Sequence, residues 1–71
     1  MTGQEWIERF ATTLGVPAPS AEQVDQILRL AGEAAHASER TAAPVACWLA
    51  ATAGLSPEDA LARAEAQESG S

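Results

Sequence analysis

The first candidate cluster of ionisable side chains in this sequence is the run His36-Ala37-Ser38-Glu39-Arg40. An imidazole, a carboxylate and a guanidinium within about two helical turns are groups that proton transfer or anion binding would use. His36 and Arg40 are four residues apart, so on a helix they share one face. Because a neighbouring positive charge lowers the basicity of an imidazole, this pair favours an anion-binding edge over a general base.

The same residues also have a purely structural interpretation. His36 and Arg40 would interact favourably with the negative C-terminal end of one helix, and Glu39 with the start of the next helix. Catalysis would need a second ionisable group that reaches His36 from elsewhere, and the remaining acids fall mostly on predicted solvated faces. We therefore expect no enzymatic activity. A ligand site formed by His36, Glu39 and Arg40 and the structural interpretation both stay open.

Composition excludes several other classes of site. The single His and the single Cys, Cys47, lie on either side of a predicted helix break and do not have the spacing of metal ligands, so no metal site and no cofactor are expected. The net charge of −6, with four Arg and no Lys, argues against nucleic acid and against an anionic membrane surface. A lone Cys fits a reducing compartment, and no signal-peptide or bilayer-spanning run is present, so a cytoplasmic location is expected.

The elements that must position these residues are predicted to be helices. Hydrophobic residues make up 46% of the 71 residues, and much of this share is Ala, the strongest helix former. The sequence has no Tyr and few β-branched residues, so it has little material for strands. We expect an all-α, compact bundle of about four short helices in a single domain over residues 1–71. The expected helices are 3–14, 21–38, 43–53 and 57–67.

Capping residues mark the ends of these helices. Thr2 with Glu5, and Ser20 with Gln23, have the spacing of a capping box, in which two side chains satisfy free backbone N–H groups at a helix start. The run Ser56-Pro57-Glu58-Asp59 combines an N-cap hydroxyl, a proline at the first helical position and acids near the positive end of the helix dipole. These signals predict where three of the four helices begin.

Apolar residues recur at helical spacing in each predicted helix. We expect the stripes led by Phe10, Ile27, Trp48 and Leu61 to meet in a shared interior. Trp6 lies at the edge of the first stripe, and a bundle this small buries only part of an indole there. Trp6 is therefore the predicted interaction surface.

The sequence resembles a known family over nearly its whole length. The segments that carry the resemblance are Leu14-Gly15-Val16, Val24 to Leu30, Ala35 to Pro44, Trp48-Leu49 and Gly54 to Leu61. They resemble a family of short bacterial domains of unknown function that occur alone or fused to molybdenum cofactor (molybdopterin) guanylyltransferases. The family pattern draws attention to His36, Glu39, Arg40 and Pro44 without assigning them a chemistry.

The resemblance implies an accessory role in the biosynthesis of the molybdenum cofactor, molybdopterin guanine dinucleotide. The chain itself has no nucleotidyltransferase signature, so we expect a non-catalytic accessory or protein-interaction domain. Its expected partner is a protein, either a molybdenum cofactor guanylyltransferase or a second copy of the chain in a homodimer. The alternative is a domain that binds a small anionic ligand through His36 and Arg40.

Overall fold

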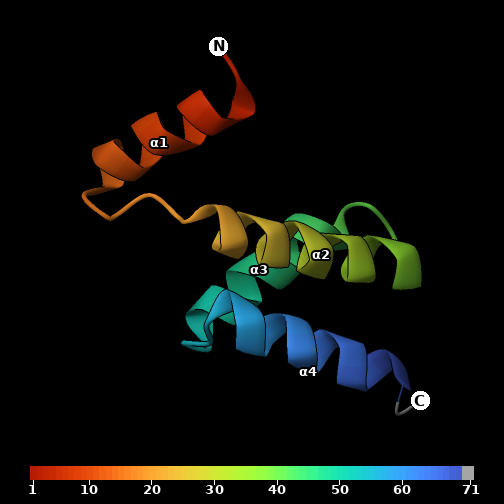
Figure 1. The fold of residues 1–71 in the computed structure, drawn as a ribbon. Coiled ribbons are helices and arrows are strands. Elements are labelled where there is room, and N and C mark those ends of the chain that lie inside the picture. The colour runs from red at the N-terminus through yellow and green to blue at the C-terminus, as the bar shows by residue number, and fades with distance from the viewer. Residues whose placement is uncertain (70–71) are drawn as a thin grey trace.

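Four α-helices make up residues 1–69, the part of the chain that the computed structural model describes, and no strand occurs among these residues (Figure 1). The helices are α1 (Gly3–Leu14), α2 (Ala21–Ala37), α3 (Ala42–Thr52) and α4 (Pro57–Ser69). The predicted compact all-α fold of about four helices is confirmed. The predicted ranges differ from these bounds by two residues at most. The predicted domain extends to residue 71, and its last two residues lie outside the described part.

α1 begins at the capping box that the sequence indicates. The Thr2 hydroxyl accepts a hydrogen bond of 3.1 Å from the Glu5 backbone N–H, and the Glu5 carboxylate accepts one of 2.9 Å from the Thr2 backbone N–H. The helix ends at Gly15, whose φ of +74° is a left-handed conformation that costs glycine least. Local hydrogen bonds therefore define both ends of α1 without help from the rest of the molecule.

The capping box makes the stability of α1 depend on pH. The hydrogen bond that the Thr2 backbone N–H donates to the Glu5 carboxyl lowers the pKa of this carboxyl below its ordinary value of 4.5. Hydrogen bonding with the Thr2 side chain lowers it further. A group with a depressed folded-state pKa stabilises the fold above its unfolded pKa, and this contribution is lost as the pH falls through the folded pKa. We expect acid to weaken the cap in the wild type but not in Glu5→Gln, whose amide keeps the hydrogen bond without titrating.

NMR chemical shifts of the Thr2 and Glu5 amides, followed from about pH 6 to about pH 3, measure this loss. Glu5→Ala provides the second control, because it lacks the carboxylate half of the capping box at every pH and keeps only the hydrogen bond from the backbone N–H of residue 5 to the Thr2 hydroxyl. The interpretation is wrong if the wild type and Glu5→Gln show the same change in these amides over this range.

α2 and α4 also begin as predicted. The Ser20 hydroxyl accepts a hydrogen bond of 3.1 Å from the Gln23 backbone N–H. The Gln23 side-chain oxygen accepts one of 2.9 Å from the Ser20 backbone N–H, which completes the capping box. The Ser56 hydroxyl accepts a hydrogen bond of 3.1 Å from the Asp59 backbone N–H. α3 ends in the turn at Gly54, which has a φ of +75°. These short connections turn the chain back on itself twice and bring α3 and α4 against α2.

α2 is the central helix, and it packs against both α3 and α4. The buried residues at this junction are Leu30 of α2 and Ala60 and Leu61 of α4. The half-buried residues packed around them are Cys47, Ala50, Leu55 and Ala64. Arg29 of α2 also pairs with Glu65 of α4 at 3.6 Å, but both side chains are about half exposed, so this ion pair contributes little. The core is therefore small and depends on two leucines.

Two residues expected in the shared interior lie on the surface instead. Leu61 is buried and Ile27 is half-buried, but Phe10 is 47% exposed and Trp48 is 66% exposed. Trp48 is exposed because α3 turns its small side chains, not its large ones, toward α2. Phe10 is exposed because α1 lies beyond the N-terminal end of α2 and packs far less closely than the other helices (Figure 1). The expectation of one interior shared by all four stripes was wrong at these two positions.

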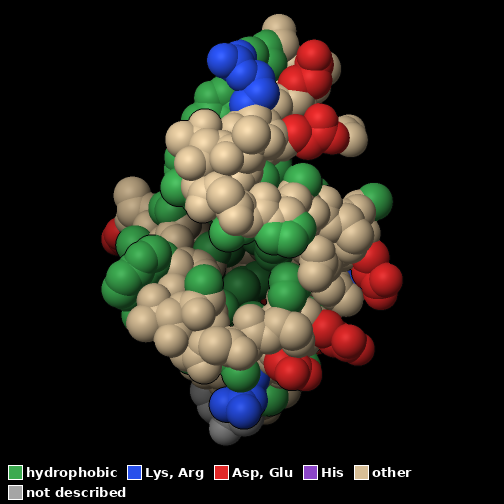
Figure 2. Space-filling view, turned by 90° about the vertical axis from the view of Figure 1, so that its left-hand side faces the viewer, with side chains coloured by type: hydrophobic (Ala, Val, Ile, Leu, Met, Phe, Trp, Pro, Cys, Tyr) green, Lys and Arg blue, Asp and Glu red, His purple; other side chains and the backbone are tan. Residues whose placement is uncertain are grey.

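Hydrophobic side chains consequently form part of the outer surface. Figure 2 shows them along one edge of the molecule, from the end that carries α1 downward, and around a central hollow. A hollow of about 110 Å³ lies between α2, α3 and α4 and is lined by Ile27, Leu30, Cys47 and Ala60 among others. No helix within residues 1–69 is both long enough and apolar enough to cross a membrane.

Candidate functional site

The first candidate surface is a line of large apolar side chains along α1. Trp6, Phe10 and Leu14 are spaced four residues apart, so they lie above one another on one face of the helix, and we call them the α1 stripe. Their exposed fractions are 55%, 47% and 58%. The rings of Trp6 and Phe10 stack, with centroids 5.0 Å apart and an interplanar angle of 30°. The stripe is thus an ordered aromatic surface that no other helix covers.

The neighbouring edge of α1 faces the rest of the molecule. Ile7 shares a groove of about 410 Å³ with Pro19, Val24 and Leu28. Ala11 is buried, because the chain folds back over it and the Val16 backbone N–H donates to the Ala11 carbonyl oxygen at 3.0 Å. This contact uses only one edge of the apolar face of α1, and the α1 stripe remains turned away from α2.

The second candidate surface is the outer side of α3. Val45, Trp48 and Leu49 are 56%, 66% and 55% exposed. The opposite side of the helix carries four small half-buried residues at positions i, i+3, i+4 and i+7, which are Ala43, Ala46, Cys47 and Ala50. Small side chains let two helices approach closely, so α3 packs on α2 through its small residues and presents its large apolar residues outward.

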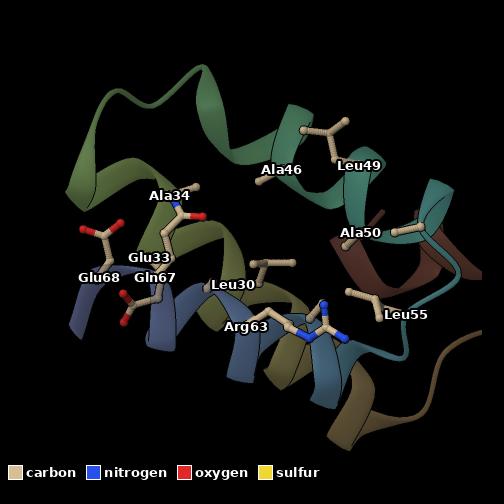
Figure 3. Close-up of a pocket in the computed structure, with 13 residues that line it drawn as sticks. Leu30, Glu33, Ala34, Ala46, Leu49, Ala50, Leu55, Arg63, Gln67 and Glu68 are labelled. Atoms are coloured by element: carbon tan, nitrogen blue, oxygen red, sulfur yellow. The ribbon is translucent and has the colours of Figure 1, made fainter. Parts of the chain in front are cut away.

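The third feature is an open groove between α3 and α4, which we call the α3–α4 groove (Figure 3). It has a volume of about 360 Å³, and Leu30 of α2 lies at its centre. Its walls are mostly small apolar residues, including Ala46, Ala50, Ala53, Ala60 and Ala64. Charged and amide side chains, Glu33, Arg63, Gln67 and Glu68, complete its lining. The groove is therefore apolar inside and carries charges of both signs.

The predicted ligand residues lie together where α2 ends and α3 begins. His36 is in the last turn of α2, and Glu39 and Arg40 follow in the connection. All three are exposed, and none lines the grooves described above. Glu39 accepts a hydrogen bond of 3.5 Å from the Thr41 hydroxyl, whereas His36 and Arg40 form no side-chain hydrogen bond or ion pair among the described residues. The structure thus brings these residues to one corner but does not enclose them.

The start of α3 offers few backbone donors to an anion at this corner. The Ala42 backbone N–H donates to the Glu39 carbonyl oxygen at 3.0 Å, and the Ala43 backbone N–H donates to the Arg40 carbonyl oxygen at 3.1 Å. Pro44 has no N–H. Because anion sites at helix starts depend on free N–H groups, an anion here would rely mainly on the side chains of His36 and Arg40. Anion binding at this corner stays a prediction.

Cys47 is the one thiol of the chain, and it lies half-buried on the side of α3 that faces α2. Burial raises the pKa of the Cys47 thiol above its ordinary value. A raised pKa reduces the fraction of reactive thiolate at neutral pH, so Cys47 has the character of a packing residue rather than a nucleophile. Within residues 1–69, no three His, Cys, Asp or Glu side chains are grouped as metal ligands.

Reasoning from sequence identified Trp6 as a surface residue but missed the other exposed apolar residues of α1 and α3. Phe10 and Trp48 were read as core residues because they are large and apolar. The signal that could have identified the outward side of α3 is the stripe of small residues at helical spacing, beginning at Ala43. Such a stripe indicates the side on which a helix approaches its neighbour, and the large residues then lie on the other side.

The profile of a family described as a domain of unknown function, DUF6457, matches residues 1–70 of the chain. The chain belongs to the DUF6457 family. This membership confirms the expected likeness to a family of domains of unknown function, and the match carries no information about fusion to guanylyltransferases. The comparisons with curated proteins and with solved structures found no match for this DUF6457 domain.

Proposed function

We propose that this DUF6457 domain is a non-catalytic accessory domain that binds another protein. The observation that carries the proposal is the α1 stripe, an ordered line of Trp6, Phe10 and Leu14 that is about half exposed. Uncovered apolar surface of this kind is typical of interaction sites rather than of a free monomer surface. The outer side of α3, with Trp48, adds a second such area.

The chemistry of these surfaces supports a protein partner more than a small molecule. Small-molecule sites are enclosed and place a few polar groups around the ligand, whereas the α1 stripe is a convex helix face without polar groups. Aromatic residues are enriched in protein interfaces and account for much of their binding free energy. The ionisable groups near His36 are exposed and not enclosed, so they support neither catalysis nor a built ligand site.

The proposed partner is a molybdenum cofactor guanylyltransferase. This part of the proposal is supported by the resemblance of the sequence to domains that occur alone or fused to such enzymes. The chain lacks a nucleotidyltransferase signature of its own, so its contribution would be to bind the enzyme and not to transfer the nucleotide. Its formal charge of −6 favours a partner with basic residues around an apolar contact.

The proposal is tested by measuring binding between the purified chain and a purified molybdenum cofactor guanylyltransferase from the same organism by isothermal titration calorimetry. We expect binding that weakens at least about tenfold in Trp6→Ala, because truncation of a buried interface tryptophan costs about 2 kcal/mol or more. Trp6 is exposed in the free chain, so the substitution leaves the core intact.

Thr12→Ala is the matched control, because Thr12 lies on the polar side of α1, away from the stripe. This variant is expected to bind like the wild type. No binding by the wild type would remove the proposed link to this enzyme. Equal binding by the wild type and Trp6→Ala would show that the α1 stripe is not the contact.

A further inference from the structure

The three helices α2, α3 and α4 form a bundle with one position left open. α2 packs against α3 and against α4, while α3 and α4 diverge and leave the α3–α4 groove between them (Figure 3). In a four-helix bundle a fourth helix lies in this position. α1 does not fill it, because no residue of α1 lines the groove. The fold therefore contains an unfilled helix position and, separately, a helix with an uncovered apolar face.

The sizes of the side chains on these two surfaces are complementary. The groove is walled by alanines around Leu30, so it accepts large side chains from a partner. The α1 stripe presents large side chains and no small ones. Its spacing of i, i+4 and i+8 is that of an amphipathic helix that lies in an apolar groove. A helix seated there would also cover Leu49, which lines the groove and is 55% exposed.

The charges around the two surfaces are compatible with contact between identical chains, although each chain has a formal charge of −6. α3, which forms one wall of the groove, carries no charged residue. Arg9 is next to Phe10 at one flank of the α1 stripe and forms no ion pair among the described residues. The lining of the groove includes the carboxylates of Glu33 and Glu68 as well as the guanidinium of Arg63. A positive side chain at the edge of the stripe would thus meet a rim that is partly acidic.

The contact between the α1 stripe and the α3–α4 groove supplies much of the area that a stable dimer needs. The large side chains in this contact that are about half exposed are Trp6, Phe10 and Leu14 of the stripe and Leu49 of the groove. With roughly 150–250 Å² for an aromatic side chain and less for Leu, they offer on the order of 350 Å² per chain. Two chains would bury on the order of 700 Å² through these side chains, and the groove walls add further area toward the about 1,200 Å² at which stable interfaces begin.

We propose that α1 of one copy lies in the α3–α4 groove of a second copy, and that the second copy returns the contact in a twofold symmetric dimer. In such a dimer both α1 stripes and both α3–α4 grooves are covered, so neither surface is left open for a third copy. The short connection between α1 and α2 leads α1 away from its own groove (Figure 1), which favours a partner chain over the same chain. This inference deepens the proposed interaction role and rests on it, because it names the partner of the α1 stripe in the absence of any enzyme.

Sedimentation equilibrium of the full chain tests the proposal, with circular dichroism to verify helicity. We expect the wild type to be a dimer. Phe10→Glu in the stripe and Leu49→Glu in the groove should each raise the dimer dissociation constant at least about a hundredfold, because a buried unpaired carboxylate opposes contact. Thr12→Glu adds the same charge on the polar side of α1 and should leave the dissociation constant unchanged. A wild type that stays monomeric at millimolar concentration would overturn the proposal.

Mixing the variants distinguishes this arrangement from other dimers. A mixture of Phe10→Glu and Leu49→Glu contains one intact stripe and one intact groove, so it should form heterodimers although neither variant forms homodimers. If two α1 stripes instead packed against each other, Leu49→Glu would still dimerise alone, and the proposal would be wrong. If α1 filled the groove of its own chain, the protein would be monomeric. In a Trp48→Phe background, the fluorescence of Trp6 would then be shifted to the blue. This result would also contradict the proposal.

These outcomes are separable from those of the enzyme-binding test. The mass is measured with no enzyme present, so a monomeric chain that still binds the guanylyltransferase would refute only the dimer. A dimer that does not bind the enzyme would refute only the proposed enzyme partner.

Discussion

Leu30→Ala is expected to leave a large fraction of the protein unfolded at 25 °C. Leu30 is 6% exposed and is one of two large side chains at the centre of the core. Truncating a buried leucine costs about 2–5 kcal/mol, and a chain of this size typically has a net stability of only about 3–5 kcal/mol. The substitution therefore removes most or all of the free energy of unfolding. Urea denaturation followed by circular dichroism at fixed protein concentration measures the loss.

Leu28→Ala is the matched control for this substitution. Leu28 lies in the same helix and undergoes the same chemical change, but its side chain is 65% exposed. Substitutions at exposed positions usually change stability by less than about 0.5 kcal/mol, so Leu28→Ala should unfold at nearly the wild-type urea concentration. Equal losses in the two variants would contradict the assignment of Leu30 to the core. A small loss in both would show that the stability comes from elsewhere in the chain.

The helix ends could be predicted from the sequence because their causes are local. The hydroxyl of Thr2 meets the backbone N–H of Glu5 three residues later, whatever the rest of the chain does. Gly15 and Gly54 adopt positive φ at the ends of helices for the same local reason. Signals of this kind need no knowledge of tertiary packing. The boundaries therefore follow from residue types and spacing alone.

The burial of the side chains could not be predicted in the same way. α3 carries two stripes at helical spacing, a large apolar one with Trp48 and a small one with Ala46 and Ala50. Hydrophobicity favours burial of the large stripe, whereas close helix packing favours burial of the small one. Close packing decides the orientation of α3 in this structure. The sequence of one chain contains no information about a partner that would cover Trp48.

The candidate site follows the same division. The corner of His36, Glu39 and Arg40 lies where α2 ends, and Trp6 is exposed at the edge of α1. The expectation that His36 and Arg40 share a helix face was wrong, because α2 ends at Ala37 and Arg40 lies in the connection. The α3–α4 groove could not be predicted, because its walls come from residues of three helices and its shape depends on how far α3 and α4 diverge. Surfaces formed by one helix were therefore accessible from the sequence, and a surface formed between helices was not.

Ala60→Asp is expected to destabilise the fold by at least about 2 kcal/mol, because it places a carboxylate at a position where the residue is 4% exposed. Ala60 packs with Leu30 and Leu61 where α4 contacts α2. Ala62→Asp is the control, since it puts the same side chain on the exposed side of the same helix, with the same effect on helix propensity. The difference between their urea midpoints isolates the effect of burial.

The pH dependence of this difference identifies its cause. Burial raises the pKa of a carboxyl in the folded state, so the folded state of Ala60→Asp favours the protonated form. The cost of the substitution is then greatest above the folded-state pKa and decreases as the pH falls toward the unfolded value of about 4. We expect the urea midpoints of Ala60→Asp and Ala62→Asp to converge in acid. A difference that is constant with pH would mean that the volume of the side chain, and not its charge, separates α4 from α2.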